Sequence, residues 1–115
     1  DDSIVRGHTS RRLVETLLKN GAKEVHLLIS SPPVRYPDFY GIDTPKQNEL
    51  IASSKTVEEI REFLGATSLT FLSLEGMIKS IGIPKENLCT SFFTGEYPID
   101  LLERKSEVSY EVPNK

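Results

Sequence analysis

The first ten residues, DDSIVRGHTS, combine side chains from which a site for a phosphorylated sugar can be built. A glycine-containing turn that leads directly into a helix gathers free backbone N–H groups and the positive end of the helix dipole around one point, which suits a phosphate. Ser3 to Thr9 have this layout. Gly7 lets the backbone approach closely, and the hydroxyls of Ser3 and Thr9 are further donors. We therefore predict that residues 3 to 9 form a phosphate cradle.

Asp1 and Asp2 need a different partner, because two carboxylates beside a phosphate would repel it. Sugar hydroxyls can donate to carboxylates, and a Mg²⁺ ion shared with a second phosphate group can be bound by them. An ordinary helix N-cap is the competing interpretation of the Gly, Thr and Ser. The adjacent carboxylates favour a site for a phosphorylated sugar.

The elements that must position these residues alternate between helix and strand. Apolar spacing and capping residues predict helices over residues 9–20, 57–65 and 74–81. Short apolar runs predict strands over residues 24–30 and 69–72, the first covered on both faces. Such alternation is typical of an α/β layer with parallel strands and right-handed crossovers. Ligands of such sheets bind at the carboxyl ends of the strands, so we expect the cradle to lie there.

Further predictions concern individual segments. Thr56 and Glu59 have the spacing of a capping box. Residues 89–95, CTSFFTG, are expected to form one more strand or an extended segment, with Cys89 as a small buried apolar residue. His26 lies inside an apolar strand and is interpreted as a core or interface histidine. The helix over residues 74–81 is expected to turn four side chains to the core, namely Leu74, Met77, Ile78 and Ile81.

A proline-rich stretch follows the first strand and excludes regular structure over residues 30–47. A connection of this length is usually functional or wraps a neighbour. Arg35, Tyr36 and Tyr40 lie in it, and we favour packing against another subunit over covering of the substrate.

Composition narrows the class of protein. The 115 residues suffice for one compact core, so we expect one domain or part of one. A formal net charge of −3 gives no basic field, and we expect neither nucleic acid nor an anionic membrane as a partner. A single cysteine and the lack of a long apolar run favour the cytoplasm. Because the chain has no initial Met and its motif starts at residue 1, we expect it to be a piece of a longer polypeptide.

The opening motif resembles the phosphoribosyl pyrophosphate motif of the type I phosphoribosyltransferases, in which an acidic pair precedes a turn of small and hydroxyl residues. DDSIVRG is similar to the amidophosphoribosyltransferase branch, the glutamine-dependent enzymes that open purine synthesis. The similarity continues in order through GAKEVHLLISSPPVRYPDFYGID, IREFLGATSLTFLSLEG and FTGEYP. It covers about residues 1 to 98.

The resemblance implies a three-layer type I phosphoribosyltransferase fold with a parallel sheet, of which only the C-terminal part is present. Residues 1–98 would belong to that domain, and residues 99–115 would be a charged C-terminal tail. Asp1 and Asp2 would hold the ribose 2′- and 3′-hydroxyls and help to place Mg²⁺. The residues that would bind the 5-phosphate are Ser3, Ile4, Val5, Arg6, Gly7, His8 and Thr9.

The resemblance also implies an activity. In this family, ammonia made from glutamine displaces pyrophosphate from phosphoribosyl pyrophosphate and yields 5-phosphoribosylamine. The glutamine domain and other parts of the sugar site have no counterpart in these 115 residues, so the isolated piece is expected to be inactive. The full-length parent is expected to be a homo-oligomer that nucleotides inhibit.

Two departures from the family pattern change these expectations. His8 stands where the family commonly has Thr, which removes one hydroxyl from the cradle. Many members hold an iron–sulfur cluster with three cysteines, whose positions are occupied here by Asp38, Cys89 and Phe92. One thiolate cannot replace three, so no cluster is expected.

A rival interpretation is a non-catalytic module with the same fold that senses phosphoribosyl pyrophosphate or nucleotides. Relatives of that kind regulate transcription and generally append a DNA-binding domain. The proline-rich stretch and the FTGEYP ending favour the enzyme.

Overall fold

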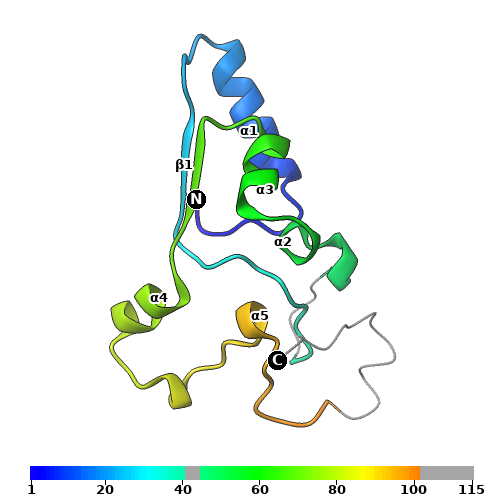
Figure 1. The fold of residues 1–115 in the computed structure, drawn as a ribbon, viewed down its shortest axis with the longest axis vertical. Coiled ribbons are helices and arrows are strands. Elements are labelled where there is room, and N and C mark those ends of the chain that lie inside the picture. The colour runs from blue at the N-terminus through cyan, green and yellow to red at the C-terminus, as the bar shows by residue number, and fades with distance from the viewer. Residues whose placement is uncertain (41–44, 102–115) are drawn as a thin grey trace.

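The computed structural model describes residues 1–40 and 45–101, and its core is a parallel β-sheet with helices beside it (Figure 1). β1 and β2 pair in parallel, with His26 opposite Ser68 and Ile29 opposite Phe71. The predicted α/β alternation and the parallel pairing are confirmed. The described elements are α1 (His8–Lys19), β1 (His26–Ile29), η1 (Gln47–Glu49), α2 (Ile51–Ser54), α3 (Val57–Leu64), β2 (Ser68–Phe71), α4 (Leu74–Ile81), η2 (Lys85–Asn87) and α5 (Ser91–Thr94).

Asp1 extends the sheet on the other edge of β1. Its backbone nitrogen donates to the carbonyl of Leu28 at 2.9 Å, and the N–H of Ser30 donates to its carbonyl at 3.0 Å. This is the bonding pattern of neighbouring parallel strands. The carbonyls of Val25 and Ile29 accept instead from the β2 side. Asp1 therefore lies at the carboxyl end of β1, where the sequence predicts ligand binding.

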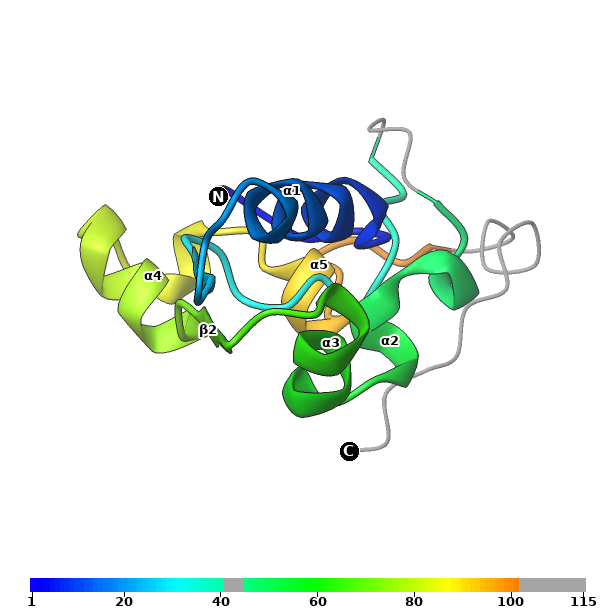
Figure 2. The same ribbon diagram turned by 90° about the horizontal axis from the view of Figure 1, so that it is seen from above.

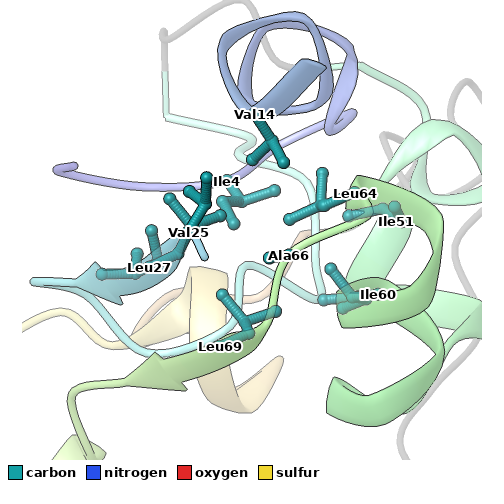
Figure 3. Packing of buried hydrophobic residues seen from close by; sticks show 11 residues of the cluster. Ile4, Val14, Val25, Leu27, Ile51, Ile60, Leu64, Ala66 and Leu69 are labelled. Carbon is teal, nitrogen blue, oxygen red and sulfur yellow. The ribbon is translucent and has the colours of Figure 1, made fainter. Parts of the chain in front are cut away.

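The hydrophobic core fills the space between the sheet and the helices α1 and α3 on one of its faces (Figures 2 and 3). Val14 from α1 and Leu64 from α3 are at most 1% exposed. Ile4, from the predicted cradle, is 2% exposed in the same cluster. Each such side chain stabilises the fold by ~1.5–3 kcal/mol. The core thus fixes the cradle to the sheet and to both helices.

The opposite face of the sheet is open in the part of the chain that the structure describes. Leu27 and Ile29 are buried, whereas His26 is exposed and Leu28 is 71% exposed. The prediction that this strand is covered on both faces is therefore wrong for the described residues. His26 does not lie in a core, and its place in an interface stays a prediction. The reason is that α1 and α3 lie on the same side of the two strands (Figure 2). The described residues contain one sheet and one layer of helices over it.

The start of α3 is fixed by the predicted capping box. The Thr56 hydroxyl accepts from the N–H of Glu59 at 3.2 Å, and the Glu59 carboxylate accepts from the N–H of Thr56 at 2.7 Å. In the same first turn, the hydrogen bond from Arg61 lowers the pKa of the Glu58 carboxyl. These contacts explain why α3 begins where the sequence predicts.

Three predictions for the second half of the chain are wrong. Residues 89–95 contain the helical turn α5 where a strand or extended segment was expected, because three successive N–H groups donate back to the carbonyls of Thr90 and Ser91. Cys89 is exposed. α4 forms as predicted but buries none of its residues, and Ile81 is 49% exposed. The expected core face, Leu74, Met77, Ile78 and Ile81, has no packing partner that buries it among the described residues.

The proline-rich stretch packs against α5 and the segment that follows it. The carbonyl of Phe92 accepts from the N–H groups of both Arg35 and Tyr36. The Tyr97 hydroxyl donates to the carbonyl of Pro37 at 2.6 Å, and its ring meets Phe39 edge-on at 5.3 Å. Residues 31–40 therefore belong to a second, smaller packed region.

Residues 41–44 of the proline-rich stretch lie outside the described residues, as do residues 102–115 of the predicted charged tail. Leu101, at the start of that tail, is 6% exposed. None of the helices within the described ranges has the length and hydrophobicity that crossing a bilayer requires.

Candidate sugar-phosphate site

The predicted site residues line one cavity at the carboxyl end of β1 and the N-terminus of α1. The cavity has a volume of about 450 Å³, and its walls are residues 1 to 10. It includes every position predicted for the ribose and the phosphate, from Asp1 to Thr9. The structure thus brings these residues together, and their roles stay predictions.

The first turn of α1, whose residues line this cavity, has unused hydrogen-bond donors. The first backbone bond of the helix runs from the N–H of Arg11 to the carbonyl of Gly7 at 2.9 Å. The N–H groups of His8, Thr9 and Ser10 have no acceptor among the described residues. No side chain caps the helix, and no acidic residue lies in its first turn. Free donors and the positive helix end together suit an anion.

Gly7 meets two structural requirements in addition to the close approach to a ligand that the sequence predicts. Its φ of +83° lies in the left-handed region, which residues other than glycine rarely adopt. A Cβ atom there would lie 3.0 Å from Cδ1 of Ile51 and 3.2 Å from Cε1 of Phe63. The missing side chain therefore faces apolar atoms of α2 and α3. The absence of a side chain at Gly7 therefore allows the turn to pack closely against Ile51 and Phe63.

The two cradle residues before Gly7, Val5 and Arg6, also contact the segment around η1 and α2. Val5 offers its carbonyl to the N–H of Ile51 at 2.9 Å. The Nη2 atom of Arg6 donates to Oε2 of Glu49 at 2.9 Å, and both side chains are about half exposed. Because Ile4 is buried, Ile4 and Val5 can offer a ligand chiefly their backbone N–H groups. In the cradle, Ile4 and Val5 therefore offer backbone donors, whereas Arg6 also offers a polar side chain.

The two carboxylates are oriented by the backbone that follows them. Oδ1 of Asp1 accepts from the N–H of Asp2 at 2.9 Å, and Oδ1 of Asp2 accepts from the N–H of Ser3 at 2.7 Å. Both residues are exposed. Each carboxylate therefore has a second oxygen that can accept from a sugar hydroxyl or bind a cation.

These carboxylates suit Mg²⁺ only together with oxygens of a ligand. The described residues contain no group of three or more His, Cys, Asp or Glu side chains that could hold a metal ion. Mg²⁺ is commonly held by one or two carboxylates together with substrate phosphates and water. Asp1 and Asp2 are hard oxygen donors, so their chemistry fits this mode of binding.

Ser10 is a cavity residue that the sequence prediction missed. It is 5% exposed and lines the same cavity as Ser3 and Thr9. The signal was the run of two hydroxyl residues at positions 9 and 10. His8 is exposed, and its ring meets Phe63 edge-on at 6.2 Å.

A second polar cluster lies at the amino end of the sheet. Nδ1 of His26 is hydrogen-bonded to the Ser68 hydroxyl at 2.7 Å, and Nε2 to the Glu24 carboxylate at 3.1 Å. These residue types resemble a nucleophilic triad, which also requires donors for an oxyanion and a pocket. None of the three lines the cavity of residues 1 to 10, nor either of two others, one around residues 85–98 and one between residues 28–30 and 70–73. We assign this cluster no catalytic role.

Comparison with known proteins identifies relatives over about nine-tenths of this chain. No family model matches the chain. The amidophosphoribosyltransferase of Bacillus subtilis (strain 168) is 54% identical over 107 residues, which cover 90% of this chain and 22% of the relative. The Synechococcus elongatus enzyme of the same name is 52% identical over 103 residues, which cover 90% of this chain and 21% of the relative. The chloroplastic amidophosphoribosyltransferase 2 of Arabidopsis thaliana is 49% identical, covering 91% of this chain and 19% of that relative.

A solved structure agrees in fold. The B. subtilis glutamine phosphoribosylpyrophosphate amidotransferase, in complex with ADP and GMP, matches with a TM-score of 0.82 and 54% identity. The match covers 90% of this chain and 24% of that one. The chain is homologous to part of the amidophosphoribosyltransferases. It spans about a fifth of the length of the curated relatives it matches.

The three positions that the resemblance assigns to cluster-binding cysteines are Asp38, Cys89 and Phe92. Asp38 accepts from the N–H of Tyr40 at 3.0 Å. Cys89 lies 3.3 Å from the Ser91 hydroxyl, measured from Sγ to Oγ, and Phe92 has no metal-binding atom in its side chain. The absence of an iron–sulfur cluster stays a prediction.

Proposed function

We propose that this chain forms the ribose 5-phosphate part of the active site of an amidophosphoribosyltransferase. The whole enzyme would convert phosphoribosyl pyrophosphate and glutamine to 5-phosphoribosylamine, the first step of de novo purine biosynthesis. The observation that carries the proposal is the cavity of residues 1 to 10, where unused N–H groups and two carboxylates meet. The 54% identity to an enzyme of this name supports it.

The cradle supplies donors to the 5-phosphate. The N–H groups at the start of α1 would bind its oxygens, and the hydroxyls of Ser3 and Thr9 would add further hydrogen bonds. The helix dipole favours the negative charge at this point. Because the donors are fixed before the ligand arrives, little reorganisation accompanies binding.

The carboxylates act on the ribose. The free oxygens of Asp1 and Asp2 would accept from the 2′- and 3′-hydroxyls and orient the ring. Their negative charge would stabilise the positive charge that develops on the ring when pyrophosphate leaves. Both residues would also help to hold Mg²⁺, which neutralises charge on the pyrophosphate.

The other partners follow from the whole enzyme. Glutamine would supply the ammonia at a site outside this chain, so the isolated 115 residues are expected to be inactive. Nucleotides are proposed as inhibitors, which the ADP and GMP in the B. subtilis structure support. We also propose a homo-oligomer in the cytoplasm.

The test is a pair of substitutions at the carboxylates in the full-length enzyme. Asp1→Asn with Asp2→Asn should lower the rate of phosphoribosylamine formation by about 10²–10³-fold, because the charge that stabilises the transition state is lost. Glutamine hydrolysis should stay measurable, because its site is elsewhere.

The matched control is Glu62→Gln with Glu75→Gln, which removes the same charge from exposed positions on α3 and α4. This control should retain both activities. A rate of phosphoribosylamine formation as high in the Asn variant as in the control would contradict the assigned role.

A further inference from the structure

The phosphate cradle is held from outside by one segment, residues 47–54, which we call the brace. The N–H of Ile51 donates to the carbonyl of Val5, and Glu49 accepts from Arg6, both at 2.9 Å. Ile51 also fills the space where a Cβ of Gly7 would lie, at 3.0 Å. Three successive cradle residues thus contact one short segment more than 40 positions away in the sequence.

The brace is itself well fixed. The Ser53 hydroxyl donates to the carbonyls of Gln47 at 2.6 Å and Leu50 at 2.8 Å, which joins η1 to α2. Leu50 is completely buried, and Ile51 is 7% exposed. The backbone of Glu49 therefore belongs to a well-packed segment, and its carboxylate can hold the long side chain of Arg6 in place.

Arg6 lies between the brace and the cavity. Arg6 is one of the residues that line the cavity, and its Nη2 atom donates to Glu49. A guanidinium carries five N–H donors in a planar fork, so one bond to Glu49 orients the group and leaves other donors for a ligand. The two side chains are 52% and 47% exposed, so the pair contributes orientation more than stability.

We propose that Glu49 is a positioning residue for the phosphate cradle. Acting through Arg6, it holds residues 5–7 in the shape that directs the unused N–H groups into the cavity. This inference rests on the proposed function, because it assigns Glu49 to the same phosphate site. It predicts that Glu49 affects binding of the substrate phosphate and leaves the chemical step alone.

The experiment uses the full-length enzyme and the substitutions Glu49→Ala, Arg6→Ala and both together. Glu49→Ala should raise KM for phosphoribosyl pyrophosphate about threefold to fivefold with kcat within about twofold, the size expected for an exposed ion pair. Arg6→Ala should raise KM at least as much. The double variant should be no worse than Arg6→Ala, because Glu49 acts only through that residue.

Two further measurements separate positioning from a general structural effect. Glu15→Ala removes an equally exposed carboxylate that pairs with Arg11 on α1, and it should leave KM unchanged. Raising the ionic strength should reduce the KM ratio of Glu49→Ala to wild type toward one, because salt screens the exposed pair.

The outcomes are distinct. An unchanged KM in Glu49→Ala, a lower KM, or a further rise on adding Glu49→Ala to Arg6→Ala would each overturn the positioning role. A wild-type enzyme that does not use phosphoribosyl pyrophosphate would instead overturn the proposed function.

Discussion

The two ends of the sheet carry similar side chains but differ in what their polar groups do. At the amino end, the two ring nitrogens of His26 are hydrogen-bonded to Ser68 and Glu24, and none of the three lines the cavity of residues 1 to 10. At the carboxyl end, the first turn of α1 leaves its N–H groups unused beside a cavity of about 450 Å³. A binding site in this protein is thus marked by free donors around a cavity. A triad of suitable residue types does not mark one.

The cause of this difference lies in the backbone. At the amino end, Thr67 satisfies both backbone polar groups of Val25: its N–H donates to the carbonyl of Val25, and its hydroxyl accepts from the N–H of Val25. At the carboxyl end the chain passes from Asp1 through a left-handed residue, Gly7, into a helix without a side-chain cap. A helix start of that kind has donors that only water or a ligand can satisfy.

The largest effect that would sharpen this contrast is expected at Gly7. Gly7→Ala should raise KM for phosphoribosyl pyrophosphate at least about tenfold, because a Cβ at positive φ costs ~1–2 kcal/mol and overpacking against Ile51 adds ~1–3 kcal/mol. Steady-state kinetics of the full-length enzyme measure the change in KM.

The matched control is Gly82→Ala. Gly82 has a φ of +78°, but nothing lies within 4 Å of its Cβ position, so this variant carries the backbone strain without the packing conflict. Adding Ile51→Val to Gly7→Ala removes the nearest atom, Cδ1, and should recover part of the loss. Equal KM values for Gly7→Ala and Gly82→Ala would contradict the role of the turn.

The smallest effect is expected at the amino end. His26→Ala and Ser68→Ala should each leave kcat and KM for phosphoribosyl pyrophosphate within about twofold of wild type, because neither residue lines the cavity. The same kinetic assay provides the measurement. A loss of a hundredfold in either variant would show that the triad-like cluster takes part in the reaction.

Local patterns explain how much of the fold could be predicted from the sequence. The capping box of Thr56 and Glu59 and the apolar spacing around Val14 lie within single elements, so α3 and α1 follow from them. The burial of individual side chains was harder to predict, because it depends on which other elements pack against them. Leu28 belongs to an apolar run but is 71% exposed, and α4 buries none of its residues.

The part of the candidate site that is contiguous in the sequence could be predicted. Asp1 to Thr9 follow one another along the chain, so one motif contains them, and the structure places them in one cavity. Glu49 meets Arg6 only because the chain returns after 43 residues, and no local pattern predicts that contact. The packing around Gly7 could not be predicted from the sequence either, since Ile51 and Phe63 come from distant elements.

Hydrogen exchange of the full-length enzyme, with and without ribose 5-phosphate, tests the central claim most directly. The claim is that the unused N–H groups at the start of α1 bind the phosphate. Ribose 5-phosphate should slow amide exchange in a peptide that covers residues 4–10 and leave residues 24–28 and 66–70 unchanged. Unchanged exchange over residues 4–10 at a saturating concentration of the ligand, or slowing confined to the amino end of the sheet, would contradict the account.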